Sequence, residues 1–213
     1  MALPEVLSRI AAAARRTGRE PAEVTLVAVT KGRSIEEIER RVLAYGDFPL
    51  GESRVQEARA KIAAMPQRRW HFIGPLQRNK VRYMRPFRLI HSLDGIRLAE
   101  ALAARAEREG YKARVLLEVN VAREPQKHGV LPEELDPAVR KLKGLEPLTL
   151  LGLMTVAPLA DDPEEVRWVF RELAAMAKEH GLPQLSMGMS DDFEVAVEEG
   201  ATLVRVGRAL FTE

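Results

Sequence analysis

Short apolar runs alternate with longer amphipathic stretches along the whole sequence, and this alternation constrains the fold more than any other feature. The apolar runs are rich in Val, Leu and Ile, which is typical of strands buried in a sheet. We expect eight strands, at residues 24–30, 48–51, 70–73, 88–91, 114–119, 148–155, 184–188 and 202–206.

Most of the stretches between these runs have helical periodicity. Ser34, with Glu37 three residues later, predicts a capped helix that continues to about Tyr45. Gly181 predicts the end of another helix. Helices are expected at residues 4–16, 34–45, 54–64, 96–109, 132–142 and 163–180, with a short one between 191 and 200.

Eight strands with intervening helices in 213 residues predict one α/β domain. We interpret the chain as a single (β/α)8 TIM barrel over residues 1–213, with an extra helix before the first strand. The strands lack a clean polar face, as expected for a parallel sheet that helices cover. A doubly wound open sheet is the competing arrangement.

Composition narrows the classes of protein and of ligand. Charged residues make up 30% of the chain, but the formal net charge is only +2, so a nucleic-acid partner is not expected. The chain has no cysteine, which excludes a disulfide scaffold and a thiolate nucleophile. Isolated histidines give no metal-ligand spacing. No apolar run is long enough for a membrane helix, and we expect a cytoplasmic protein without a metal.

Lys31 directly follows the apolar run VTLVAVT, at the carboxyl end of the first predicted strand. Active sites of barrels lie at this end of the strands. A lysine held among apolar side chains loses solvation, so its pKa falls and its amine becomes able to form a Schiff base. The alternative is a lysine that leaves the sheet and meets water.

The segment SMGMSDD places Ser186 and Ser190 around Gly188, after the seventh predicted strand. Hydroxyls and backbone N–H groups at a helix start can hold a phosphate. The alternative is an ordinary turn with Ser190 as the helix N-cap.

The segment LVRVGRALF follows on the eighth predicted strand, where Arg205 shares one face with Leu203 and Gly207. A buried arginine needs an acceptor, which is a ligand or a core partner. Loops after the seventh and eighth strands often hold phosphate in TIM barrels, so the two segments together favour a phosphate site.

The segment WHFIGPLQRNK places His71 and Ile73 on one face of the third predicted strand. His71 is either a hydrogen-bond partner for a ligand or a satisfied core histidine. Dinucleotide, P-loop and GxSxG motifs do not occur in the sequence.

The segments AVTKGRS, GESRVQEARAK, WHFIGPLQRNK, GLMTVAP and LSMGMSDDFEVAVEEGATLVRVGRALF together resemble the pyridoxal 5′-phosphate homeostasis proteins, the YggS/PROSC family. The resemblance runs in matching order from about residue 24 to residue 211, and it implies a barrel like the N-terminal domain of alanine racemase.

The resemblance also implies a site for pyridoxal 5′-phosphate (PLP). The family's Schiff-base lysine corresponds to Lys31, and the arginine that faces the pyridine nitrogen corresponds to Arg205. The phosphate pocket corresponds to residues Ser186, Met187, Gly188, Ser190, Gly207 and Arg208.

Two positions depart from the family pattern. Ser53 stands where the family usually has an asparagine that faces the cofactor, and Arg208 stands where a hydroxyl residue is common. Arg208 can still donate its backbone N–H to a phosphate, and its side chain adds positive charge.

The resemblance implies a carrier or buffer that holds PLP and takes part in PLP homeostasis. An arginine beside the ring nitrogen weakens the cofactor as an electron sink, and a barrel of this size leaves no room for the second domain of the racemases. The alternative is a PLP-dependent amino-acid racemase of the same fold type; a sugar-phosphate barrel enzyme with Lys31 as its base is a third interpretation. PLP-dependent apo-enzymes are the candidate partners, and a monomer or weak dimer is expected.

Overall fold

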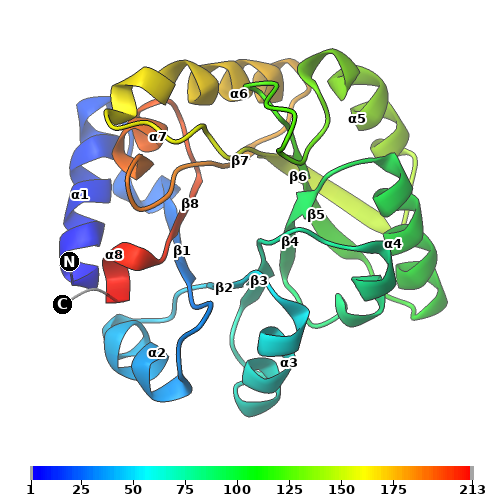
Figure 1. The fold of residues 1–213 in the computed structure, drawn as a ribbon, viewed down its shortest axis with the longest axis horizontal. Coiled ribbons are helices and arrows are strands. Elements are labelled where there is room, and N and C mark those ends of the chain that lie inside the picture. Colours follow the sequence, from blue (N-terminus) through cyan, green and yellow to red (C-terminus); the bar gives the residue numbers. More distant parts are fainter. Residues whose placement is uncertain (1, 212–213) are drawn as a thin grey trace.

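The eight predicted strands form a closed, all-parallel barrel in the computed structural model, which describes residues 2–211. Each strand pairs with the next in chain order, and the barrel closes between the first strand and the eighth. Helices surround the strands (Figure 1). The structure thus confirms the predicted TIM barrel and excludes the open sheet. No helix within residues 2–211 combines the length and apolar character needed to cross a bilayer.

The strands lie close to their predicted ranges. They are β1 (Thr25–Val29), β2 (Leu50–Glu52), β3 (Trp70–Phe72), β4 (Leu89–Leu93), β5 (Ala113–Glu118), β6 (Leu148–Met154), β7 (Gln184–Ser186) and β8 (Leu203–Val206).

The helices include the extra one at the start of the chain. They are α1 (Leu3–Arg16), α2 (Ile35–Arg41), α3 (Val55–Ala64), α4 (Ile96–Arg108), α5 (Leu135–Lys143), α6 (Arg167–Glu179), α7 (Phe193–Glu198) and α8 (Arg208–Phe211). Short 3-10 helices are η1 (Pro21–Glu23), η2 (Leu43–Tyr45), η3 (Arg78–Tyr83), η4 (Pro132–Glu134) and η5 (Pro163–Val166).

The structure departs from the predicted helices after Ser34. The helix predicted over 34–45 has the expected capping box of Ser34 and Glu37, but it breaks at Val42 and continues as the 3-10 turn η2. The connection from β3 to β4, where no helix is predicted, contains only the 3-10 helix η3. Gly181 follows the end of α6 with a φ of 64°, which confirms its predicted role as a helix terminator.

Apolar side chains fill two separate regions because successive residues of a strand point to opposite faces. The larger region lies between strands and helices and includes Leu26, Leu50 and Leu153. The smaller one fills the barrel interior as a layer that consists of Val27, Leu89, Leu116, Met154 and Leu203. On each strand, the next inward-facing side chain toward the carboxyl end therefore lies directly above this apolar layer.

An ion-pair network attaches the extra helix α1 to the barrel. Arginines of α1 and α6 face glutamates of α7 and the glutamate just after it, so that helix α1 shares one cluster of charges with α6 and α7. The pairs are Arg9–Glu194, Arg16–Glu194, Arg16–Glu198, Arg167–Glu198, Arg167–Glu199 and Arg171–Glu199.

A buried ion pair fixes the carboxyl ends of β1 and β2 against α3. Nζ of Lys61 lies 2.7 Å from Oε1 of Glu52 and donates to the carbonyl of Thr30, also at 2.7 Å. The hydroxyl of Thr30 donates to the same carboxylate oxygen at 2.5 Å. Glu52 and Thr30 are fully buried. These contacts set the direction in which the chain leaves β1, one residue before Lys31.

Replacing Lys61 with Met should destabilise the fold by roughly 3–5 kcal/mol, because Glu52 would keep a buried charge without its partner. Chemical denaturation of the purified protein measures the change. The double variant Lys61→Met/Glu52→Gln should recover part of the loss, and Lys141→Met, which removes an exposed pair, should cost no more than about 1 kcal/mol. Equal effects of Lys61→Met and Lys141→Met would contradict this account.

Candidate functional site

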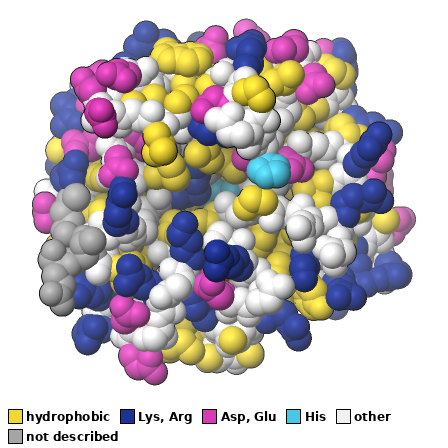
Figure 2. Space-filling model, viewed as in Figure 1, with side chains coloured by type: hydrophobic (Ala, Val, Ile, Leu, Met, Phe, Trp, Pro, Cys, Tyr) yellow, Lys and Arg dark blue, Asp and Glu magenta, His cyan; other side chains and the backbone are white. Residues whose placement is uncertain are grey.

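A layer of polar side chains lies inside the barrel at the carboxyl ends of the strands, directly above the apolar layer. His71, His91, Glu118, Ser186 and Arg205 contribute to it from five different strands, and each is at least nine-tenths buried. Figure 2 shows one face of the molecule, where apolar side chains gather around the centre. In TIM barrels the carboxyl ends of the strands carry the functional site, which makes this layer the candidate.

A continuous chain of hydrogen bonds crosses the barrel within this layer. Arg205 donates to Oγ of Ser186 at 2.6 Å and to the carbonyl of Thr155 at 2.9 Å. Oγ of Ser186 lies 2.7 Å from Nδ1 of His91, and Nε2 of His91 lies 2.9 Å from Nδ1 of His71. Because Arg205 can only donate, we infer that Ser186 donates to His91 and that His91 donates to His71. In this arrangement every contact of the chain pairs one donor with one acceptor, with both imidazoles neutral.

Burial accounts for the protonation states along this chain. Burial, followed by the positive charges of Arg69 and Arg88, lowers the pKa of His71 to about 4. Burial, then His71 and Arg205, lowers the pKa of His91 well below its ordinary value. Burial also lowers the pKa of Arg205 to about 10, with Glu118 and Asp192 opposing that change. At neutral pH the layer therefore holds one cation and two neutral imidazoles.

Glu118 ends β5 with its side chain in the wall of a cavity of about 220 Å³. Ile73, Met154 and Val156 contribute apolar surface to this cavity, and Asn120 contributes an amide. Burial raises the pKa of Glu118 to about 7, against the opposing effect of Arg205. The cavity thus combines apolar walls with a carboxyl group that titrates near neutrality.

The segment after β7 folds tightly against β8 and α7. Gly188 has a φ of 90°, and a Cβ there would lie 2.6 Å from Cβ of Ala196, so no other residue fits without rearrangement. The carbonyl of Gly188 accepts from the backbone N–H of Arg205 at 2.9 Å, and Met187 donates its N–H to the carbonyl of Leu203. The segment therefore has a fixed position relative to β8.

Ser190 connects this segment to the start of α8. Its hydroxyl oxygen accepts from the backbone N–H of Ala209 at 3.3 Å, whereas Asp192 is the N-cap of α7. The structure thus overturns the interpretation of Ser190 as that N-cap. The neighbouring Arg208 is exposed, and its guanidinium forms an ion pair with Asp191 that offsets the added positive charge.

Lys31 lies at the turn that follows β1, next to the segment that follows β8. A Cβ at Gly207 would lie 3.0 Å from Cβ of Val29, which shows how closely the ends of the two strands approach. Arg33 places its guanidinium 4.8 Å from the ring centre of Phe211 in α8. The side chain of Lys31, however, is exposed. This exposure agrees with the alternative interpretation of a lysine that leaves the sheet and meets water, because the chain turns at Lys31 and Gly32 shortly after β1 ends.

Ser53 directly follows β2 and His71 lies on the neighbouring β3, but only His71 belongs to the hydrogen-bond chain. Ser53 follows β2 and packs against the end of β3, where a Cβ at Gly74 would lie 2.2 Å from the carbonyl oxygen of Ser53. His71 is satisfied by His91 in this structure. The structure thus brings Ser186 and Arg205 together with His71, and Ser190 together with the start of α8, while Ser53 and Lys31 lie at the rim.

Sequence reasoning missed His91 and Glu118 as members of the site. The signal that identified Lys31 and Arg205, a polar residue near the carboxyl end of an apolar run, applies equally to these two. The contribution of Thr155 is a backbone carbonyl, for which the sequence carries no signal. The residues that the structure describes contain no group of three or more metal-ligating side chains.

Comparison with known proteins agrees with this geometry. Residues 3–213 match the family described as alanine racemase, N-terminal domain. The pyridoxal phosphate homeostasis protein of Deinococcus radiodurans is 49% identical over 213 residues, which is 99% of this chain and 100% of that protein. The protein of the same name from Aquifex aeolicus is 44% identical over 99% of this chain and 96% of its own.

Solved structures show the same relationship. PipY of Synechococcus elongatus, solved with PLP bound, has a TM-score of 0.82 and 35% identity over 97% of this chain and 100% of its own. Alanine racemase of Corynebacterium glutamicum has a TM-score of 0.70 at 18% identity and shares the fold, with 62% of its chain covered. The barrel with a polar layer at its carboxyl mouth is thus an alanine racemase N-terminal domain. Within that class the chain belongs to the family of pyridoxal phosphate homeostasis proteins.

The raised pKa of Glu118 should make stability fall with rising pH. Its carboxyl has a pKa of about 7 in the folded protein against an ordinary 4.5, so between these values the unfolded chain releases a proton that the folded chain keeps. Glu118→Gln removes this dependence. The variant should therefore gain stability relative to the unsubstituted protein between pH 5 and pH 8, as measured by denaturant unfolding. A difference that is constant across this range would contradict the assignment.

Proposed function

We propose that this chain acts in the cytoplasm as a protein that holds PLP reversibly at the carboxyl mouth of its barrel. One observation carries the proposal. Arg205, the segment 186–190 and the start of α8 lie together, and they adjoin the end of β1, which Lys31 follows. Relatives that match the chain over nearly its full length are named for PLP homeostasis, and one solved relative contains PLP.

The residues present fit the chemistry of PLP. Ser190 supplies a hydroxyl, and the tightly folded backbone near Gly188, Gly207 and Arg208 supplies amide groups for the phosphate. Arg205 supplies a buried donor for the pyridine nitrogen. Lys31 supplies a primary amine at the rim, where it is accessible to an aldehyde. When bound, PLP supplies that aldehyde, which condenses with an amine to a Schiff base with loss of water.

In this proposal Arg205 sets the electronic state of the ring. Its guanidinium is held in place by Ser186 and Thr155, and its pKa of about 10 keeps it charged at neutral pH. A cation that can only donate favours an unprotonated ring nitrogen, which is a weak electron sink. Ser186 acts through Arg205 in this arrangement, because its own hydroxyl is already engaged on both sides.

The exposed amine suits a carrier better than an enzyme. An amine open to water can be reached by a PLP molecule arriving or leaving, and it lacks the closed surroundings that exclude water from a reacting centre. PLP-dependent apo-enzymes are the proposed recipients, and the proposed state is a monomer or weak dimer. Amino-acid racemisation is the competing activity, since the barrel is shared with alanine racemase.

Lys31→Ala should abolish the visible absorption that PLP gives when it is bound through an imine to the natural protein. The measurement is an absorption spectrum after addition of PLP and removal of free cofactor. Lys178→Ala, an exposed lysine on α6, is the matched control and should leave the band unchanged. Retention of the band in Lys31→Ala would refute the lysine assignment.

Arg205→Glu should shift this absorption band and speed PLP loss during dialysis, because a carboxylate beside the pyridine nitrogen would favour its protonation. Unfolding temperatures of the protein without PLP identify any part of the effect that comes from lost hydrogen bonds to Ser186 and Thr155. An unaltered spectrum would count against a contact between Arg205 and the ring.

Exchange of the α-proton of amino acids with deuterated water distinguishes the carrier from the racemase. With PLP bound, the protein should give no exchange above that of free PLP at the same concentration, measured by proton NMR with alanine. Exchange that increases with protein concentration and is lost in Lys31→Ala would favour the enzyme.

A further inference from the structure

The amino-terminal mouth of the barrel, opposite the proposed PLP site, forms a second cavity of about 1010 Å³. Its walls come from residues that precede or begin strands β3 to β7, with Thr149 and Gln184 at the starts of β6 and β7. Leu151 packs against the apolar layer of the barrel interior. That layer separates this cavity from the polar layer at the other end.

Positive charge is concentrated in this cavity without acidic residues in its walls. Six cationic side chains line it: Arg68, Arg69, Arg85, Arg88, Lys112 and Arg114. We refer to these six residues as the basal cluster. In contrast, the whole chain has a formal net charge of only +2. The basal cluster therefore accounts for a strong local excess of charge in a balanced chain.

Most of the basal cluster lacks counter-charges. Arg68 and Arg69 share the carboxylate of Asp47, at 3.4 and 3.3 Å. The other four members are exposed, and within residues 2–211 they form no ion pair with an acidic side chain. The arginines of α1 and α6 show the opposite pattern, because each of those in the network faces one to three glutamates.

The charge of this cluster acts on the barrel interior. After burial itself, Arg69 and Arg88 are the groups that lower the pKa of His71. Two polar atoms of the cavity wall, Nε of Arg68 and Oε1 of Gln184, are buried without a hydrogen-bond partner. Like charges held close together raise the free energy of the protein, and an anion bound between them would lower it.

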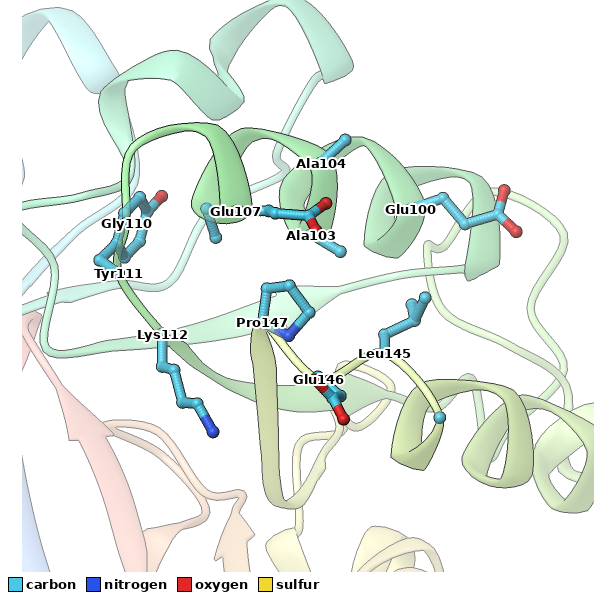
Figure 3. A pocket seen from close by; sticks show the side chains of 12 residues that line it. Glu100, Ala103, Ala104, Glu107, Gly110, Tyr111, Lys112, Leu145, Glu146 and Pro147 are labelled. Atoms are coloured by element: carbon cyan, nitrogen blue, oxygen red, sulfur yellow. The ribbon is translucent and has the colours of Figure 1, made fainter.

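A neighbouring groove is lined mainly by acidic rather than basic charged residues. Figure 3 shows this groove of about 710 Å³ between α4 and the turn before β6, with Glu100, Glu107 and Glu146 on its walls. Lys112 extends away from α4 in this view. The two cavities share Tyr111 and Lys112 but differ in charge, so an anion would be held only at the barrel end.

The geometry points to a site for a small polyphosphate at the amino-terminal mouth, held by the basal cluster. Arginine forks bind phosphate oxygens in pairs, and the cavity has the volume of a small-molecule site. A concave site at one end of a barrel favours a compact polyanion over a nucleic acid, which needs an extended basic surface. Phe87 and Leu151 add apolar surface on which an organic group attached to the phosphates could pack.

Isothermal titration calorimetry of the full chain with inorganic tripolyphosphate and with ATP tests the proposal. Both should bind, with affinity that falls as salt is raised. Tighter binding of ATP would identify nucleotides as the natural source, and equal binding would identify inorganic polyphosphate; either result supports the site. Absence of binding by both probes at low salt would overturn it.

Paired variants locate the binding. Arg88→Gln/Arg114→Gln should weaken tripolyphosphate binding at least tenfold, and Arg85→Gln/Lys112→Gln should do the same. The matched control Arg15→Gln/Arg140→Gln removes two charges from helices α1 and α5 and should change affinity less than twofold. An equal loss in the control would show a net-charge effect and overturn the site. Tighter binding of a 20-nucleotide uridine RNA than of ATP, lost in the same variants, would also overturn it in favour of a nucleic-acid surface.

Discussion

The burial of one guanidinium inside the barrel determines the arrangement of the functional end. Arg205 is fully enclosed, and a charge in such a place is tolerated only when its donors are satisfied. Two of these donors bond to a hydroxyl from β7 and to a carbonyl after β6, and the same hydroxyl extends the chain of hydrogen bonds to two histidines. Loss of any member would leave a buried polar group without a partner.

The two ends of the barrel differ in how many cationic side chains they hold and in how these side chains are compensated. At the carboxyl mouth a single buried cation is surrounded by oriented partners and by a carboxyl group whose pKa is raised to about 7. At the amino-terminal mouth several exposed cations lie together with little compensation. The apolar layer between them separates the two groups of charges.

The rim residues differ from the buried floor in their exposure to water. Lys61 and Glu52 fix the path of the chain up to Thr30, and beyond that point the turn at Lys31 is open to water. In the proposed function, the buried groups around Arg205 would position a ligand, and the exposed turn at Lys31 would leave a path for its release. The racemase of Corynebacterium glutamicum has the same barrel within a longer chain.

The sequence by itself determined the barrel, because eight apolar runs separated by helical stretches in 213 residues allow few other arrangements. It also identified Arg205 and the segment 186–190, since polar residues that end buried strands must meet a partner. Only the tertiary structure decided which groups are the partners of Arg205. Ser186 lies on β7 and the carbonyl of Thr155 directly follows β6, and strand pairing brings them into one layer with Arg205. The exposure of Lys31 and the basal cluster were likewise decided by folding, because both depend on where the chain turns at the ends of the strands rather than on local pattern.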